Sequence, residues 1–201
     1  MSVVVVLLGY LLGSIPSAYI AGRVFKGIDI RNFGDGNVGA INAGRVLGRA
    51  AGVVVTIADM SKGAIAVLVA QAFASQPVVL LAGFAVVVGH NWPIYIRFKG
   101  GIGQSTTIGV FLALLPQAMG ILLAASAIPL FVMRNRMLAG VIQFAPLWLV
   151  ALLMGAPRVL VVYSIALPCL LGLRYLQTAR HRRIMLTKKP TIDEKDGHQG
   201  P

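Results

Sequence analysis

Two glycine-rich segments contain the residues best suited to chemistry. The first, residues 31–45, reads RNFGDGNVGAINAGR, and the second, residues 98–107, reads FKGGIGQSTT. Closely spaced glycines let successive backbone N–H groups turn toward one anion, and each segment leads into an expected helix whose N-terminus favours negative charge. Cations lie at the edges: Arg31 and Arg45 in the first segment, Lys99 in the second. The pattern favours phosphate binding, and flexible turns or close helix packing are the alternative for either segment alone.

Three further polar residues stand next to or inside apolar runs. Asp59 and Lys62 are three residues apart and therefore lie on one helix face. Because an isolated charge in a membrane is costly, we expect them to pair and fix helix packing; direct anion binding by Lys62 is the alternative. His90 lies shortly before the second glycine segment, where it is either an interfacial residue or a candidate base or phosphate contact. The sequence contains no metal-ligand spacing, and we expect no metal and no cofactor.

The composition places the elements that carry these residues in a membrane. The chain has 201 residues, of which 57% are hydrophobic and 12% charged, and its mean hydropathy is +0.82. Soluble domains contain about 25% charged residues, so the composition indicates an all-α polytopic membrane protein. The net charge of +12 comes from clusters between apolar runs, which fits membrane orientation and anionic ligands better than nucleic acid.

Six apolar runs are long enough to cross a membrane: residues 3–22, 50–74, 77–96, 105–133, 137–156 and 159–176. The fourth run is too long for one crossing and has Pro116 near its middle, which predicts two short spans. With seven spans and an outside N-terminus, every Lys and Arg except Lys62 and Arg158 is cytoplasmic, as the positive-inside rule requires. We therefore expect seven transmembrane helices in one domain over residues 1–187, and a polar cytoplasmic tail over residues 188–201.

A set of motifs in fixed order runs through almost the whole chain. These motifs are residues 11–17, DIRN at 29–32, GNVGA at 36–40 with Asn42 and Arg45, Asp59 with Lys62 and Gly63, Gly89-His90 with Pro93, FKGG at 98–101 with Gly103, and His181-Arg182. In order and spacing they resemble the bacterial acyl-phosphate:glycerol-3-phosphate acyltransferases, the PlsY family. The resemblance implies a seven-helix enzyme of the inner (plasma) membrane with a cytoplasmic active site among membrane lipids. It would use acyl phosphate to acylate the 1-hydroxyl of glycerol 3-phosphate, giving lysophosphatidic acid for phospholipid synthesis.

The two glycine-rich segments and the resemblance together give the expected site residues. The expected phosphate contacts are Arg31, Gly34, Gly36, Asn37, Gly39, Asn42, Arg45, Lys99, Gly100, Gly101, Gly103, Ser105 and Thr106. The candidates for accepting the hydroxyl proton are Asp35, His90 and His181.

Several positions depart from the usual family pattern. Asp35 stands in place of Ser, Ile102 of Lys, Met137 of Ser and Ile184 of Asn. Asp35 adds negative charge beside the expected anion site, which weakens phosphate binding unless a cation compensates. One alternative is therefore a non-catalytic or altered-substrate relative that binds an anionic lipid or a phosphate ester. A small transporter, suggested by the charges at Asp59 and Lys62, is a third hypothesis, although no repeated pair of broken helices supports it.

Overall fold

The computed structural model describes the backbone of residues 2–187 and the side chains of residues 2–179, and the predicted tail lies outside the described residues. This part of the chain is helical and contains no strand. Its α-helices are α1 (Ser2–Ser14), α2 (Ser17–Lys26), α3 (Ala40–Val46), α4 (Arg49–Phe73), α5 (Gln76–Asn91), α6 (Gln104–Leu114), α7 (Pro116–Ala127), α8 (Arg136–Phe144), α9 (Leu147–Leu153) and α10 (Arg158–Thr187). Short 3₁₀ turns occupy η1 (Ile30–Asn32) and η2 (Ile94–Ile96), and a π-helical turn, η3 (Ile128–Val132), follows α7.

Five helical segments of the described chain are long and apolar enough to cross a membrane. They are Ser2–Lys26, Arg49–Phe73, Gln76–Ile96, Arg136–Leu153 and Arg158–Ala179. Two shorter apolar segments, Gln104–Leu114 and Pro116–Val132, fall between the third and the fourth. The break predicted at Pro116 is confirmed, because α6 ends at Leu114 and Pro116 takes the first position of α7, where its missing N–H costs no helical hydrogen bond.

Two segments that the sequence predicts as single spans are also broken. The first divides at Ile15 and Pro16 into α1 and α2, and the segment 137–156 divides at Ala145 and Pro146 into α8 and α9. Proline removes a helical hydrogen bond and clashes with the preceding turn, which explains both breaks. The first of them matters for the site, because it exposes backbone groups inside the helix bundle.

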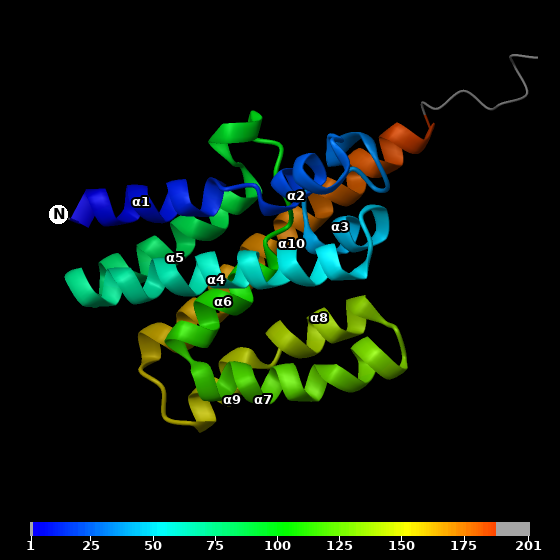
Figure 1. The fold of residues 1–201 in the computed structure, drawn as a ribbon. Helices are drawn as coiled ribbons and strands as arrows, with labels where there is room; N and C mark the ends of the chain where they lie inside the picture. The colour runs from blue at the N-terminus through cyan, green and yellow to red at the C-terminus, as the bar shows by residue number, and fades with distance from the viewer. Residues whose placement is uncertain (1, 188–201) are drawn as a thin grey trace, which may run out of the picture.

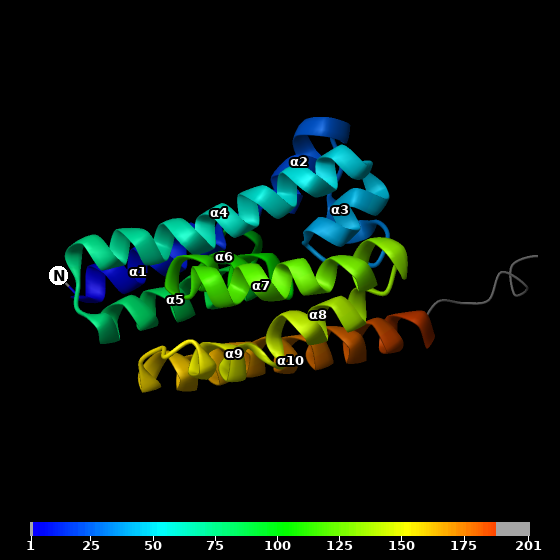
Figure 2. The ribbon, with the colours of Figure 1, turned by 90° about the horizontal axis from the view of Figure 1, so that it is seen from below.

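The long helices run roughly parallel to one another (Figures 1 and 2). Helices α1, α4 and α5 lie side by side, and α7, α8 and α10 lie on the other side of the short α6. One end of the bundle contains α2, α3, the beginning of α4, the α7–α8 turn and the end of α10. The N-terminus and the α4–α5 turn lie at the opposite end. Most of the Arg and Lys clusters thus belong to segments that share one end.

Glycines at the helix crossings allow the backbones to approach closely. A Cβ on Gly9 or Gly13 of α1 would meet the backbone of α5. Likewise, a Cβ on Gly63 would overlap the backbone of α6, and one on Gly109 would overlap that of α4. Small residues have this role at helix contacts in membranes, where close van der Waals packing replaces the hydrophobic effect. As a result, the start of α6, which is the last part of the second glycine-rich segment, lies against the middle of α4.

Candidate active site

Buried Asn42 shapes the first glycine-rich segment, residues 31–45, which we name loop 1. Its Nδ2 donates at 3.4, 3.0 and 3.1 Å to three backbone carbonyls, those of Ile30, Phe33 and Asn37. Its Oδ1 accepts from the Asp35 N–H at 3.1 Å. Gly34 has φ +61° and lies so close that a Cβ would overlap the Asn42 amide. Asn42 therefore folds loop 1 around its own side chain, with its hydrogen bonds directed to the loop backbone.

Arg31 connects loop 1 to the segment before the second loop. Its Nε and Nη2 donate to the Asp29 carboxylate at 2.9 and 2.6 Å, and its Nη1 donates to the Ile96 carbonyl at 3.3 Å. The guanidinium carbon also lies 5.2 Å from the centroid of the Tyr19 ring. Hydrogen bonding from Arg31 lowers the pKa of Asp29, and the Asp29 carboxylate raises the pKa of Arg31. This predicted phosphate contact is thus already paired with a carboxylate.

Arg45 and Asp35 form an ion pair at the rim of loop 1. Arg45 Nη1 lies 3.4 Å from Asp35 Oδ2, and the Arg45 side chain is 55% exposed. The other carboxylate oxygen of Asp35 accepts from the Asn37 N–H at 3.1 Å. The negative charge at position 35 therefore has a compensating cation, and that cation is one of the residues expected to bind phosphate.

The second glycine-rich segment, residues 98–107, packs against loop 1 and is named loop 2. The Gly101 N–H donates to the His90 carbonyl at 3.2 Å. A Cβ on Gly101 would overlap Nε2 of the His90 imidazole and come within 2.7 Å of the Val38 carbonyl in loop 1. Only glycine fits here, so Gly101 is the position at which the two loops and His90 meet.

Arg174 of α10 holds loop 2 from the other side. Its Nε and Nη2 donate to the carbonyls of Gly101 and Gly100, each at 3.2 Å. Its guanidinium carbon lies 5.1 Å from the centroid of the Trp92 ring. The sequence analysis did not select Arg174 for the site. Arg174 lies two helical turns before the predicted site residue His181 and therefore on the same face of the helix. This spacing is the sequence feature that could have indicated a role for Arg174.

A buried polar cluster connects His90 to the break in the first span. Asp59 Oδ1 accepts from Lys62 Nζ and from Ser17 Oγ, each at 2.8 Å, and lies 3.6 Å from His90 Nδ1. Lys62 Nζ also donates to the Ile15 carbonyl at 3.0 Å, where α1 ends. The predicted pairing of Asp59 with Lys62 is confirmed. The pair additionally joins α4 to the α1–α2 break and to the histidine at Gly101.

Several buried side-chain atoms near the loops have no hydrogen-bond partner among the described residues. They are Asn37 Oδ1, Asn91 Oδ1 and Nδ2, Thr106 Oγ1 and Thr107 Oγ1. Such an atom costs about 1–3 kcal/mol when it is left without a partner. Most of them belong to loop 2 or to Asn91 at the end of α5, so a polar ligand or water in this region would satisfy atoms that the described residues do not.

The structure brings most of the predicted residues together and separates a few. Loop 1, loop 2 and His90 meet at Gly101, whereas Lys99 is exposed at the outer edge of loop 2 and Thr106 is buried against α4. The side chain of His181, the third candidate proton acceptor, lies outside the described residues, as does that of Ile184.

The fold and the site together define a helical membrane protein in which two glycine-rich loops converge on a buried histidine. A family model described as glycerol-3-phosphate acyltransferase matches residues 3–185. The glycerol-3-phosphate acyltransferase 4 of Dehalococcoides mccartyi is 42% identical over 92% of this chain and 100% of its own length. The chain belongs to the glycerol-3-phosphate acyltransferase family, and the resemblance found in its motifs is confirmed.

Two solved structures of the integral membrane glycerol 3-phosphate acyltransferase PlsY are similar to this fold. The glycerol 3-phosphate form has a TM-score of 0.80 at 32% identity, and the lysophosphatidic acid form has 0.72 at 30% identity. Each match covers 93% of both chains. This protein is therefore an acyltransferase located in a membrane.

Proposed function

We propose that this protein transfers an acyl group from acyl phosphate to the 1-hydroxyl of glycerol 3-phosphate. The hydroxyl oxygen forms an ester bond to the acyl carbon, and the bond between that carbon and the phosphate oxygen breaks. The products are lysophosphatidic acid and inorganic phosphate, and the hydroxyl proton passes to a base or to the departing phosphate. Family membership, and the ligands named for the two PlsY forms, support the acceptor and the product. The motif resemblance supports the donor.

The observation that carries this proposal is the convergence of two cation-rimmed glycine loops at Gly101. Both substrates are phosphate esters or anhydrides, so the reaction needs two anion sites close to each other. Phosphate is already a good leaving group, and the main tasks of the protein are positioning and charge neutralisation. Loop 1 contributes Arg45 for this purpose, and loop 2 contributes Lys99.

The geometry divides the expected site residues into two groups. We assign direct phosphate contact to Arg45 and Lys99, to the side chains of Ser105 and Asn37, and to the loop backbone at Gly34, Gly36, Gly39, Gly100, Gly101 and Gly103. Thr106, which is buried against α4, is left out of this group. Arg31 and Asn42 instead hold loop 1 in shape, because their side chains bond to Asp29 and to the loop backbone. This assignment changes the expectation that both contact phosphate.

Three candidates for the proton acceptor remain: Asp35, His90 and His181. Nδ1 of His90 faces the Asp59 carboxylate, and its Nε2 faces Gly101. An imidazole oriented by a carboxylate in this way has the arrangement of a general base. Asp35 lies on the opposite rim, paired with Arg45.

We further propose seven membrane crossings, with the N-terminus outside, the C-terminus in the cytoplasm and the active site facing the cytoplasm. The five long and two short apolar segments supply the crossings. The cation distribution supports the orientation, since the loops of the site carry Arg and Lys and the connections at the other end carry few. In a bacterial cell this orientation corresponds to the inner (plasma) membrane.

The reaction is tested with purified protein in lipid nanodiscs, supplied with palmitoyl phosphate and glycerol 3-phosphate. We expect lysophosphatidic acid by mass spectrometry, with one phosphate released for each molecule formed and no product when either substrate is omitted. Palmitoyl-CoA in place of palmitoyl phosphate should give no product. A folded protein that binds glycerol 3-phosphate and forms no lysophosphatidic acid would contradict the proposal and favour the non-catalytic alternative.

A further inference from the structure

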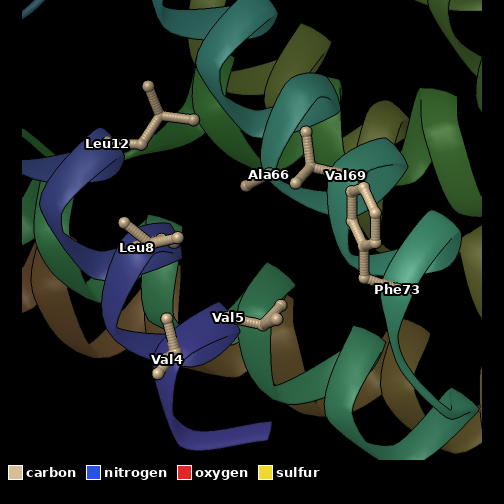
Figure 3. Close-up of a pocket in the computed structure, with 8 residues that line it drawn as sticks. Val4, Val5, Leu8, Leu12, Ala66, Val69 and Phe73 are labelled. Atoms are coloured by element: carbon tan, nitrogen blue, oxygen red, sulfur yellow. The ribbon is translucent and has the colours of Figure 1, made fainter. Parts of the chain in front are cut away.

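A row of three hydrogen-bonded polar side chains joins the start of α6 to α7 and α8. Gln104 Nε2 donates to Gln143 Oε1 at 2.9 Å, and Gln143 Nε2 donates to Ser126 Oγ at 2.9 Å. Gln143 and Ser126 are only 5% and 1% exposed. The pocket between α1 and α4 differs in kind, because apolar side chains and one glycine line it (Figure 3). Of these two features, only the row can recognise a polar group of a ligand.

The direction of the hydrogen bonds in this row is fixed at its far end. Ser126 Oγ donates its one proton to the Leu123 carbonyl at 2.9 Å, so it can only accept from Gln143. The Gln143 amide must then present Nε2 to Ser126 and Oε1 to α6. Since Oε1 can only accept, Gln104 donates through Nε2, and its own Oε1 points away from Gln143. A backbone carbonyl of α7 thus sets the orientation of an amide in loop 2.

The free end of the row is open to a ligand. Gln104 Oε1 accepts no hydrogen bond from the described residues, and it is not fully buried, unlike the unpartnered atoms of Asn91 and Thr106. Gly140 of α8 lies beside the amide nitrogen, where a Cβ would come to 3.4 Å. The nitrogen of the amide is therefore held against α8, while its oxygen stays accessible.

Gln104 also stands where the phosphate of a substrate is expected. It is the first residue of α6, directly after Gly103, whose φ is +92°. The first N–H groups of a helix have no partner within the helix and suit a phosphate. A phosphate at these groups brings the rest of its molecule within reach of the Gln104 side chain. Because an amide oxygen accepts from a hydroxyl and repels an anion, its partner is a hydroxyl of the substrate.

We propose that Gln104 binds the 2-hydroxyl of glycerol 3-phosphate through Oε1. Gln143 and Ser126 are positioning residues that keep this oxygen turned toward the substrate. The inference rests on the proposed function and adds to it a residue that distinguishes acceptors. In the proposed reaction the 1-hydroxyl gives up its proton, and the ionised phosphate has none to donate. The 2-hydroxyl is therefore the donor left for Gln104.

An acceptor that lacks only the 2-hydroxyl tests this contact. The compound 3-hydroxypropyl phosphate keeps the phosphate and the primary hydroxyl. We expect the wild-type protein to have a kcat/KM for glycerol 3-phosphate about three- to tenfold above that for 3-hydroxypropyl phosphate, the effect of one neutral hydrogen bond. Gln104→Met nearly keeps the length of the side chain and should abolish this preference. Gln117→Met, at an exposed glutamine at the start of α7, should retain it.

Gln143→Met tests the positioning role. Without Gln143 the Gln104 amide is free to rotate, and we expect the preference for glycerol 3-phosphate to fall about two- to threefold. In a Gln104→Met background the same replacement should not change the preference further, because Gln143 acts through Gln104. This double variant leaves neither amide unpartnered, so it guards against misfolding of the single ones. A merely structural role would instead lower activity with both acceptors equally.

Binding measurements decide the contact independently of turnover. Calorimetry on the protein in nanodiscs should give a Kd for glycerol 3-phosphate about three- to tenfold below that for 3-hydroxypropyl phosphate, and equal values in Gln104→Met. Equal Kd values in the wild-type protein, or a preference that Gln104→Met retains, would overturn the inference. A wild-type protein that shows the expected difference in Kd and forms no lysophosphatidic acid would contradict the proposed reaction alone.

Discussion

Arg45 and Asp35 face each other at the rim of loop 1 with 3.4 Å between nitrogen and oxygen, and in the proposed site substrate phosphate competes with this carboxylate for Arg45. The Arg45 side chain is more than half exposed, so the pair is well screened by water. Exposed pairs of this kind are worth about 0.2–1 kcal/mol. A doubly charged phosphate in contact with the loop backbone should therefore displace the carboxylate at small cost.

Replacing Asp35 by Ser should remove this competition. We expect Asp35→Ser to lower KM for glycerol 3-phosphate by about two- to fivefold, the equivalent of one exposed ion pair, with kcat retained. Steady-state kinetics in nanodiscs measure both values. If Asp35 is the proton acceptor, kcat will fall by orders of magnitude in both Asp35→Ser and Asp35→Asn, while binding of glycerol 3-phosphate is unchanged or tighter.

Arg45→Lys tests whether the guanidinium itself binds phosphate. An ammonium keeps the charge and loses the planar fork that forms two parallel hydrogen bonds. The lost charge-assisted contact is worth about 1.5–3 kcal/mol, so affinity for glycerol 3-phosphate should fall roughly ten- to a hundredfold. The control is Arg49→Lys, the same change at an exposed cation at the start of α4. Wild-type affinity in a folded Arg45→Lys protein would remove Arg45 from the phosphate site.

Among the structural elements, the contact between the loops depends on the absence of one side chain. A Cβ on Gly101 would overlap the His90 imidazole and approach the Val38 carbonyl, and neither the ring nor the backbone can move freely. We expect Gly101→Ala to lower kcat/KM about 100-fold, because misplacement of reacting groups by about 1 Å has effects of this size. Gly172→Ala is the matched control, since a Cβ on this α10 glycine meets nothing within 4 Å. Similar activity of the two variants would contradict the proposed meeting point of the loops.

Asp59 and Lys62 stabilise the first span where proline divides it. Removing one member leaves the other charge buried and unpaired, which costs about 3–5 kcal/mol. We expect Asp59→Asn and Lys62→Met each to lower the thermal unfolding temperature in nanodiscs. The double replacement, which leaves neither charge, should recover much of the loss. A double variant less stable than either single one would mean that the two residues do not act as a pair.

These elements also show which features of the structure the sequence predicts and which it does not. The apolar runs, the break at Pro116 and the Asp59–Lys62 pair follow from local rules of length, proline geometry and charge burial, so the sequence predicts them. The roles of Arg31 and Arg174 depend instead on partners far along the chain, such as the Ile96 carbonyl and the loop 2 carbonyls. A cation at a loop edge looks the same in sequence whether it faces a ligand or a backbone carbonyl.

At the scale of the whole molecule, α6 is too short to cross a membrane by itself. Its 11 residues rise about 17 Å, whereas the hydrocarbon core is about 30 Å thick. Loop 2 must therefore lie partly within the depth of the membrane if α6 is a span. Irregular backbone is tolerated there only inside the protein, and Gly101 and Gly103 are indeed buried. The active site then lies below the membrane surface, where the exclusion of water strengthens the attraction between its cations and phosphate.

The proposed topology can be tested with single cysteines in a chain that lacks its one native cysteine, by Cys169→Ala. Seven crossings with an outside N-terminus place Ser2 and Gln117 outside and Lys195 in the cytoplasm. Gln117 is decisive because it is exposed at the start of α7, next to the α6–α7 break, and α6 must cross for it to reach the outer side. In intact cells a membrane-impermeant maleimide should therefore label Ser2→Cys and Gln117→Cys, and should label Lys195→Cys only after permeabilisation. Labelling of Ser2→Cys without Gln117→Cys would reduce the crossings to five. Labelling of Ser2→Cys and Lys195→Cys from the same side would exclude any odd number.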